Sequence, residues 1–140
     1  GFEVLPICES HPKMDISWLY VQPQSLYWGI RLVTEIWKPK AIYITENGCP
    51  TKDRLTASGE VLDTDRIMFL RNYLGSAQRA AREGYPLKGY FHWSLIDNFE
   101  WAMGYTKRLG LLYVNYSTLK RTPKLSYAYY REVIKHNAVV

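Results

Sequence analysis

Cysteine and histidine are scarce in this chain of 140 residues, which contains two cysteines and three histidines. Cys8 and Cys49 lie far apart and form no CxxC pair, and no two histidines are close in sequence. Zinc sites and disulfide-stapled domains need such clusters, so the sequence favours neither and fits a reducing, cytoplasmic compartment. We accordingly expect no metal ion.

Long apolar runs and clusters of one charge sign are missing as well. The longest segment without a charged residue, 16–30, includes a proline and two glutamines, so it is too short and too polar to span a membrane. The first residues lack the basic run and apolar stretch of a targeting peptide. Lys and Arg outnumber Asp and Glu by 18 to 13, but they occur singly or in pairs, as on solvated helix faces. We expect no targeting peptide, and neither a membrane nor a nucleic-acid partner.

The residues that are present predict a folded α/β structure. Apolar residues make up 47% of the chain and aromatic residues 15%, which excludes a disordered protein. A chain of this length is most simply part or all of one domain. The spacing of apolar residues predicts three helices, at 24–37, 65–83 and 126–135, and two buried strands and a hairpin arm, at 41–45, 87–93 and 111–114.

Proline, glycine and polar residues mark the ends of these elements. Pro23 precedes the first helix, and residues 63–65 offer side-chain oxygens to cap the second. Gly84 supplies the left-handed residue that follows that helix, and Asn137 ends the last one. Residues 1–22 show no regular period and predict an irregular segment.

Two strands that are each followed by a helix predict a parallel pair with a right-handed crossover. Parallel sheets are covered on both faces, and a pair of strands leaves both outer edges open. The rest of the sheet therefore has to come from a partner chain or from the remainder of a larger polypeptide.

A candidate carboxylate lies where the first strand ends. In parallel α/β sheets, ligands bind at the carboxyl ends of the strands, and Glu46 occupies that position in the segment Thr45-Glu46-Asn47-Gly48. The same residues also suit an ordinary turn with a solvated Glu46, because Asn-Gly is a common turn pair.

The second strand ends in a segment, WSLIDNFEW at 93–101, that combines two tryptophans, two acids and an amide. Tryptophan faces stack on the C–H faces of sugars, and carboxylates and amides hydrogen-bond their hydroxyls, so the mixture favours a carbohydrate site. The alternative is structural, with Trp93 and Phe99 in the core and Asp97 and Glu100 capping loops.

Three long motifs stand out: YITENG at 43–48, KGYFHWSLIDNFEWAMGY at 88–105 and GLLYVNYSTLKRTPKLSYAYYREVI at 110–134. They closely resemble the C-terminal part of the family 1 β-glucosidases, which are (β/α)8 TIM barrels that hydrolyse β-glycosides with retention of configuration. The resemblance implies that residues 1–140 are the C-terminal segment of a single barrel domain, without a separate second domain. It also implies that the two predicted strands are the seventh and eighth of the barrel.

The resemblance further implies roles for four residues. Glu46 matches the catalytic nucleophile of the TENG motif, and Trp93 matches the tryptophan that forms the floor of the glycone subsite. Glu100 and Trp101 match the pair that binds the outer hydroxyls of that sugar. The implied substrate is a β-glucoside or a short β-linked oligosaccharide without a phosphate, which Glu100 would repel. No cofactor is implied.

The resemblance leaves the activity of the chain itself open. A retaining enzyme needs a second carboxyl as acid/base, which the family carries in an N-E-P motif that is absent from this sequence. The chain is either half of an active site, completed by the remainder of the barrel or by self-association, or a truncated non-catalytic homologue that binds at most a sugar or a protein. Leu109 replaces a usual aromatic residue, and Asn115 a common Asp. Arg121 and Lys124 are expected to be solvated.

Overall fold

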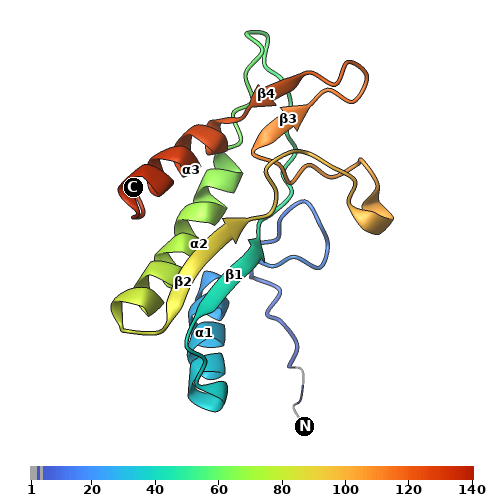
Figure 1. The fold of residues 1–140 in the computed structure, drawn as a ribbon. Helices are drawn as coiled ribbons and strands as arrows, with labels where there is room; N and C mark the ends of the chain where they lie inside the picture. Colours follow the sequence, from blue (N-terminus) through green and yellow to red (C-terminus); the bar gives the residue numbers. More distant parts are fainter. Residues whose placement is uncertain (1–2, 4) are drawn as a thin grey trace.

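The structure is a computed structural model that describes residue 3 and residues 5–140 (Figure 1). Helices cover one side of a two-stranded parallel sheet, and a small antiparallel hairpin lies beyond the arrow ends of the two strands. The predicted α/β class and element order are confirmed, with bounds that shift by one or two residues. In chain order the elements are α1 (Pro23–Trp37), β1 (Ile42–Asn47), α2 (Thr64–Arg82), β2 (Leu87–His92), the 3-10 turn η1 (Trp101–Met103), β3 (Leu112–Val114), β4 (Arg121–Pro123) and α3 (Leu125–His136).

The first helix begins at a proline and ends at a left-handed residue. Pro23 occupies the first turn of α1, where its missing N–H breaks no hydrogen bond. Lys38 closes the helix with a φ of 47°, and its N–H donates to the carbonyl of Thr34. Tyr27 and Ile30 are buried on the side of α1 that packs against α2. The predicted helix is thus confirmed together with its amphipathic face.

The sheet has one covered face and one open face. β1 and β2 run parallel, and Asn47 is paired with His92 at their carboxyl ends. The isoleucines of β1 pack against α1 and α2 (Figure 1). On the opposite face Tyr43 and Phe91 are 56% and 58% exposed. The predicted parallel pair is confirmed, and the described residues leave its second face and its outer edges open.

The start of α2 differs from its predicted capping. Asp63 occupies the N-cap position, but its side chain makes no capping bond to the helix. It is buried instead and accepts hydrogen bonds from the hydroxyl of Ser126 and from Arg66. Arg66 is itself fully buried, so the expectation that basic residues lie on solvated helix faces is wrong for this residue. At the other end, Gly84 has the predicted left-handed conformation, with a φ of 91°.

The hairpin and the last helix form as predicted, except for one lysine. β3 and β4 pair antiparallel, with Val114 opposite Arg121, which is exposed as expected. Asn137 ends α3 in a left-handed conformation with a φ of 48°. Lys124, however, is only 2% exposed, so the expectation that it is solvated is wrong. Its burial is possible because its ammonium group contacts two carboxylates.

Candidate active site

The carboxyl ends of β1 and β2 are joined backbone to backbone. The N–H of Trp93 donates to the carbonyl of Asn47 at 3.0 Å, which continues the pairing of Asn47 with His92. Gly48 follows, and a Cβ at this position would lie 1.7 Å from the carbonyl oxygen of Trp93. Because a side chain would prevent this approach, glycine is required here. Glu46 and Trp93 therefore lie at the same edge of the sheet.

Glu46 is exposed, and it belongs to the strand rather than to a loop. β1 continues to Asn47, two residues beyond its predicted end, so Asn47 closes the strand instead of opening an Asn-Gly turn. The pairing with β2 shifts between Ile44 and Asn47, an irregularity of the kind that re-aims side chains at strand ends. The carboxylate of Glu46 is thus presented to solvent from a paired, backbone-fixed element.

Trp93 and Glu100 meet across the segment that follows β2. The indole Nε1 of Trp93 donates to Oε2 of Glu100 at 3.4 Å, and Trp93 keeps 36% of its surface exposed. The N–H of Glu100 donates to the carbonyl of Gly104 at 2.8 Å across η1, and Trp101 within η1 is 83% exposed. Phe99 is 58% exposed, so the structural alternative that placed it in the core is wrong.

Two polar side chains of β2 form hydrogen bonds near the carboxyl ends of the strands. The hydroxyl of Tyr90 donates to the side-chain oxygen of Asn47 at 2.7 Å. The Nε2 of His92 lies 3.3 Å from the carbonyl oxygen of Leu109. Because a carbonyl oxygen only accepts hydrogen bonds, Nε2 carries the hydrogen in this contact. Burial lowers the pKa of His92 to about 4, so the ring is neutral near pH 7. Neither contact was evident from the sequence.

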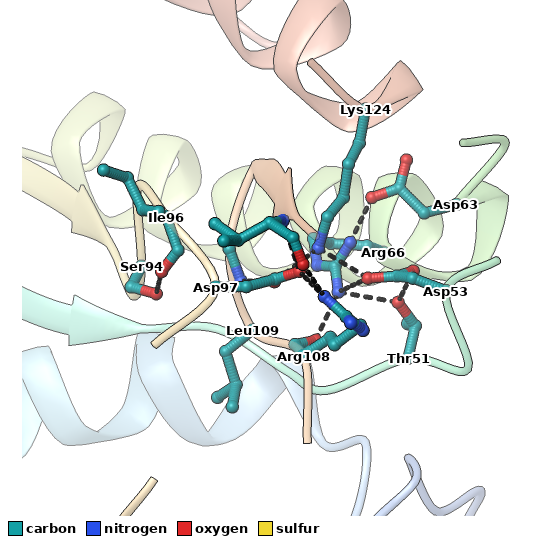
Figure 2. A network of polar contacts seen from close by, with 12 residues as sticks. Thr51, Asp53, Asp63, Arg66, Ser94, Ile96, Asp97, Arg108, Leu109 and Lys124 are labelled. Carbon is teal, nitrogen blue, oxygen red and sulfur yellow. Dashed lines mark hydrogen bonds and ion pairs between the residues drawn. The ribbon is translucent and has the colours of Figure 1, made fainter. Parts of the chain in front are cut away.

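A buried polar network lies beneath the loops that follow β1 and β2, and its members converge in Figure 2. In this network Asp97 contacts both the loop that follows β2 and the residue that precedes α3. It accepts hydrogen bonds from the N–H groups of Gly110 at 2.9 Å and Val114 at 3.3 Å. It also forms ion pairs with Arg108 at 2.6 Å and Lys124 at 2.7 Å. Asp97 is therefore a structural residue, in accord with the loop-capping alternative rather than with sugar binding.

The first loop joins the same network through Asp53. Its carboxylate pairs with Lys124 at 2.5 Å and with Arg66 at 3.0 Å, and it accepts from the hydroxyl of Thr51 at 2.5 Å. Arg66 also pairs with Asp63 and donates to the hydroxyl of Thr51 at 2.6 Å. The network thus ties both loops to the first turn of α2 and to the start of α3.

Charges in this network balance, with three carboxylates facing three cationic side chains. Burial opposes ionisation of Asp53, but Arg66 and Lys124 prevail and hold its pKa below the ordinary value. Burial, together with Arg66, lowers the pKa of Lys124 although Asp97 and Asp53 oppose this. Every charge is therefore matched, which is the condition for a stable buried ionic cluster.

Sequence reasoning found the residues at the strand ends but not those that support them. Arg66 and Lys124 belong to amphipathic or polar segments, where solvation is the ordinary outcome for a basic residue. The one local signal was the spacing of Asp63 and Arg66, three residues apart at a helix start, which suits an ion pair. Residues brought together from far apart in the chain leave no such signal.

Among the residues that the structure describes, no helix has the length and apolar character needed to cross a membrane. The same residues contain no group of three or more His, Cys, Asp or Glu side chains arranged to hold a metal ion.

Known proteins have sequences similar to this chain. The chain matches glycosyl hydrolase family 1 over residues 6–139. It is 48% identical over 128 residues to β-glucosidase A of Thermotoga maritima, a match that covers 91% of this chain and 28% of that protein. It is 44% identical over 131 residues to β-glucosidase A of Acetivibrio thermocellus, covering 94% of this chain and 29% of that protein. The chain therefore spans a little over a quarter of the length of these curated relatives.

Solved structures agree with the sequence matches. The family 1 β-glucosidase from Thermotoga maritima superposes with a TM-score of 0.92 at 45% identity, covering 96% of this chain and 30% of that one. Its complex with deoxynojirimycin superposes equally well, with a TM-score of 0.92. The chain belongs to glycosyl hydrolase family 1 and forms the C-terminal part of its (β/α)8 barrel.

Proposed function

We propose that a barrel containing this chain is a retaining β-glucosidase in which Glu46 is the nucleophile. One observation carries the proposal: the joined ends of β1 and β2 put Glu46 at the edge of the sheet that also bears the Trp93–Glu100 pair. A reactive carboxylate beside an indole and a hydrogen-bonding acid suits a sugar ring. The β-glucosidase names of the relatives support the same substrate class.

In this mechanism Glu46 attacks the anomeric carbon while the bond from that carbon to the leaving oxygen breaks. A second carboxyl, about 5–5.5 Å away, gives its proton to the leaving oxygen. The same group then takes a proton from water, whose oxygen displaces Glu46 and releases the sugar with its original configuration. Glu46 must be ionised to attack, and its exposed position at the strand end leaves it open to the substrate.

In this proposal the second carboxyl comes from outside residues 1–140. Asp53, Asp63 and Asp97 are each engaged in buried ion pairs with basic side chains. The sequence also contains no N-E-P motif. We infer that the rest of a single barrel domain, continuing the sheet past the open edges, supplies this group.

The remaining site residues bind the glycone in this proposal. The face of Trp93 stacks beneath the sugar, and the carboxylate of Glu100 accepts hydrogen bonds from its outer hydroxyls. Trp101, exposed on η1, adds a second contact to those hydroxyls. The substrate is then an unphosphorylated β-glucoside or a short β-linked oligosaccharide. We place the enzyme in the cytoplasm, where the free thiols of Cys8 and Cys49 stay reduced.

The surface of the chain supports completion by other barrel segments. Tyr43 and Phe91 are exposed on the uncovered face of the sheet. On α1, Trp28, Leu32 and Ile36 recur every four residues and are 53%, 57% and 60% exposed, which makes an apolar stripe along the helix. In a barrel these surfaces face the interior and the neighbouring helix.

The proposal is tested in a chimeric barrel, in which residues 1–140 are joined to the part of the Thermotoga maritima relative that the match leaves uncovered. We expect this barrel to hydrolyse an aryl β-glucoside and to release glucose first as the β-anomer, observed by NMR. Glu46→Gln should lower kcat by about 1,000-fold or more, because it removes the nucleophile.

Glu35→Gln is the matched control, since Glu35 is an exposed carboxylate on α1 that pairs with Arg31. It should leave kcat unchanged. A folded barrel that binds deoxynojirimycin but hydrolyses nothing would favour the non-catalytic alternative. An unaffected Glu46→Gln variant would end the assignment of the nucleophile.

A further inference from the structure

Glu100 and Trp101 lie on a protruding segment, residues 99–105, which we call the tip. Its backbone hydrogen bonds are short in range: Glu100 donates to Gly104, Met103 to Glu100 and Gly104 to Trp101. Such bonds fix the shape of the tip but not its position on the protein. The exposure of Phe99, Trp101 and Tyr105, at 58%, 83% and 58%, leaves little packing to do so.

A chain of aromatic contacts connects the tip to the hairpin. The rings of Phe99 and Tyr105 meet edge to face at 5.6 Å, and Tyr105 meets Tyr116 in the same way at 4.8 Å. Edge-to-face pairs at these distances are attractive and directional. Tyr116 is thus the residue through which these aromatic contacts connect the tip to the hairpin.

Arg108 contacts Tyr116, the last ring in this series of aromatic contacts. Its guanidinium lies 4.7 Å from the ring centre of Tyr116 and 4.0 Å from that of Tyr113. The guanidinium is fixed by the ion pair with Asp97 at 2.6 Å and by a hydrogen bond to the carbonyl of Val114 at 2.9 Å. A flat cation held at one edge by a buried carboxylate presents a rigid face to the two tyrosines.

The backbone of Arg108 contacts the loop that follows Glu46. Its carbonyl accepts from the N–H of Thr51 at 3.3 Å and from the guanidinium of Arg66 at 2.7 Å. The side chain of this one residue therefore faces the tip, and its backbone is attached to the loop of the candidate nucleophile. Figure 2 shows Arg108 between Asp97 and Thr51.

We propose that Arg108 is a positioning residue that sets Glu100 and Trp101 relative to Glu46. The proposal deepens the proposed function and rests on it for its effect on sugar binding, but its structural part stands on the contacts alone. Two other contacts near the tip are weaker: the hydrogen bond from Trp93 to Glu100 is exposed and 3.4 Å long, and the ion pair of Lys107 with Asp15 at 3.0 Å is partly exposed.

The structural part is tested by amide hydrogen exchange in the chimeric barrel. Arg108→Gln should accelerate exchange of the amides of Glu100 and Gly104 about tenfold, while amides of α2 keep their rates. Arg108→Lys, which keeps the charge but loses the flat stacking face, should restore protection only in part. Unchanged rates at the tip, or equal acceleration throughout α2, would overturn the proposal.

A second pair of variants acts at the other end of the contact and avoids disturbing the buried ions. Tyr116→Ala removes the ring between Tyr105 and Arg108 and should accelerate exchange at the tip. Tyr116→Phe is the matched control, because the Tyr116 hydroxyl has no hydrogen-bond partner among the described residues. It should leave exchange unchanged. Equal behaviour of the two variants would contradict a role for the ring.

The functional part is tested by a double-mutant cycle in the chimeric barrel. Arg108→Gln should raise the KM for an aryl β-glucoside and the Kd for deoxynojirimycin about tenfold, with a smaller change in kcat. In a background that carries both Glu100→Gln and Trp101→Ala, the same substitution should change both by less than twofold, because the two groups that it positions are gone. Equal factors in both backgrounds would show a merely structural role. The Kd is measurable without turnover, so an inactive barrel would count against the proposed function and leave this cycle readable.

Discussion

Gly48 and Trp93 touch through their backbones: a Cβ on Gly48 would lie 1.7 Å from the carbonyl oxygen of Trp93 and 2.8 Å from its carbonyl carbon. This contact brings the ends of β1 and β2 together, and with them the two halves of the candidate site. Backbone atoms of a paired strand cannot move aside for a Cβ as the end of a flexible side chain can. The glycine of the TENG motif is therefore fixed by packing, independently of any role in a turn.

We expect Gly48→Ala to destabilise the chain by about 3 kcal/mol, because the strand ends must separate to admit a methyl group. The matched control is Gly75→Ala in the middle of α2, where a Cβ meets nothing within 4 Å. Helix propensity predicts that this change stabilises the chain by about 0.5–1 kcal/mol. Urea unfolding measures both. Tolerance of alanine at Gly48 would contradict the close approach.

The buried imidazole of His92 makes stability depend on pH. Burial lowers its pKa from the ordinary 6.5 to about 4, so between these values the unfolded chain binds more protons than the folded one. Stability should therefore fall as the pH decreases through this window, by about 3 kcal/mol in total. Urea unfolding at several pH values checks the slope. His92→Gln should flatten the profile, and an unchanged slope in that variant would show that another group is responsible.

Lys124 neutralises two buried carboxylates at once, those of Asp53 and Asp97. Lys124→Met keeps the length of the side chain but leaves both acids without this cation. We expect a loss of about 3–5 kcal/mol in the free energy of unfolding. Lys120→Met, an exposed lysine between β3 and β4, should change it by less than about 0.5 kcal/mol. Similar small effects at both positions would indicate that Lys124 is solvated after all.

Glu100 should also select against phosphorylated sugars. In the proposed site its carboxylate faces the outer hydroxyls, where it would repel a 6-phosphate. The chimeric barrel is expected to prefer an aryl β-glucoside to its 6-phosphate, and Glu100→Ser should shift the ratio of the two kcat/KM values toward the phosphate by about tenfold or more. Glu132→Ser, at a partly exposed position on α3, should leave the ratio unchanged. A ratio insensitive to Glu100→Ser would remove this residue from the glycone subsite.

Local patterns predicted much of the fold. The apolar spacing between Pro23 and Pro39 gave α1 to within one residue, because helix periodicity and proline act over a few positions. The left-handed residues Gly84 and Asn137 were likewise predictable from residue type alone. The two strands were recognisable from short β-rich apolar runs, and their parallel pairing followed from the intervening helix.

The support of the site was not predictable in the same way. Arg66 and Lys124 were expected to be solvated, because nothing near them in sequence shows that acids at positions 53, 63 and 97 converge on them. Asp63 was expected to cap α2, yet the buried Arg66 and Ser126 compete more strongly for its oxygens. Contacts of this range depend on the folded topology, which local propensity does not encode.

The central claim, that Glu46 is the nucleophile, is tested most directly by trapping the covalent intermediate. In a 2-deoxy-2-fluoro-β-glucoside the fluorine slows both the formation and the hydrolysis of the glycosyl-enzyme. A reactive leaving group restores the rate of formation, so the glycosyl-enzyme accumulates. After reaction with the chimeric barrel, peptide mass spectrometry should find the sugar on the peptide that contains Glu46, and no label in the Glu46→Gln variant. A label on any other carboxylate would contradict the account.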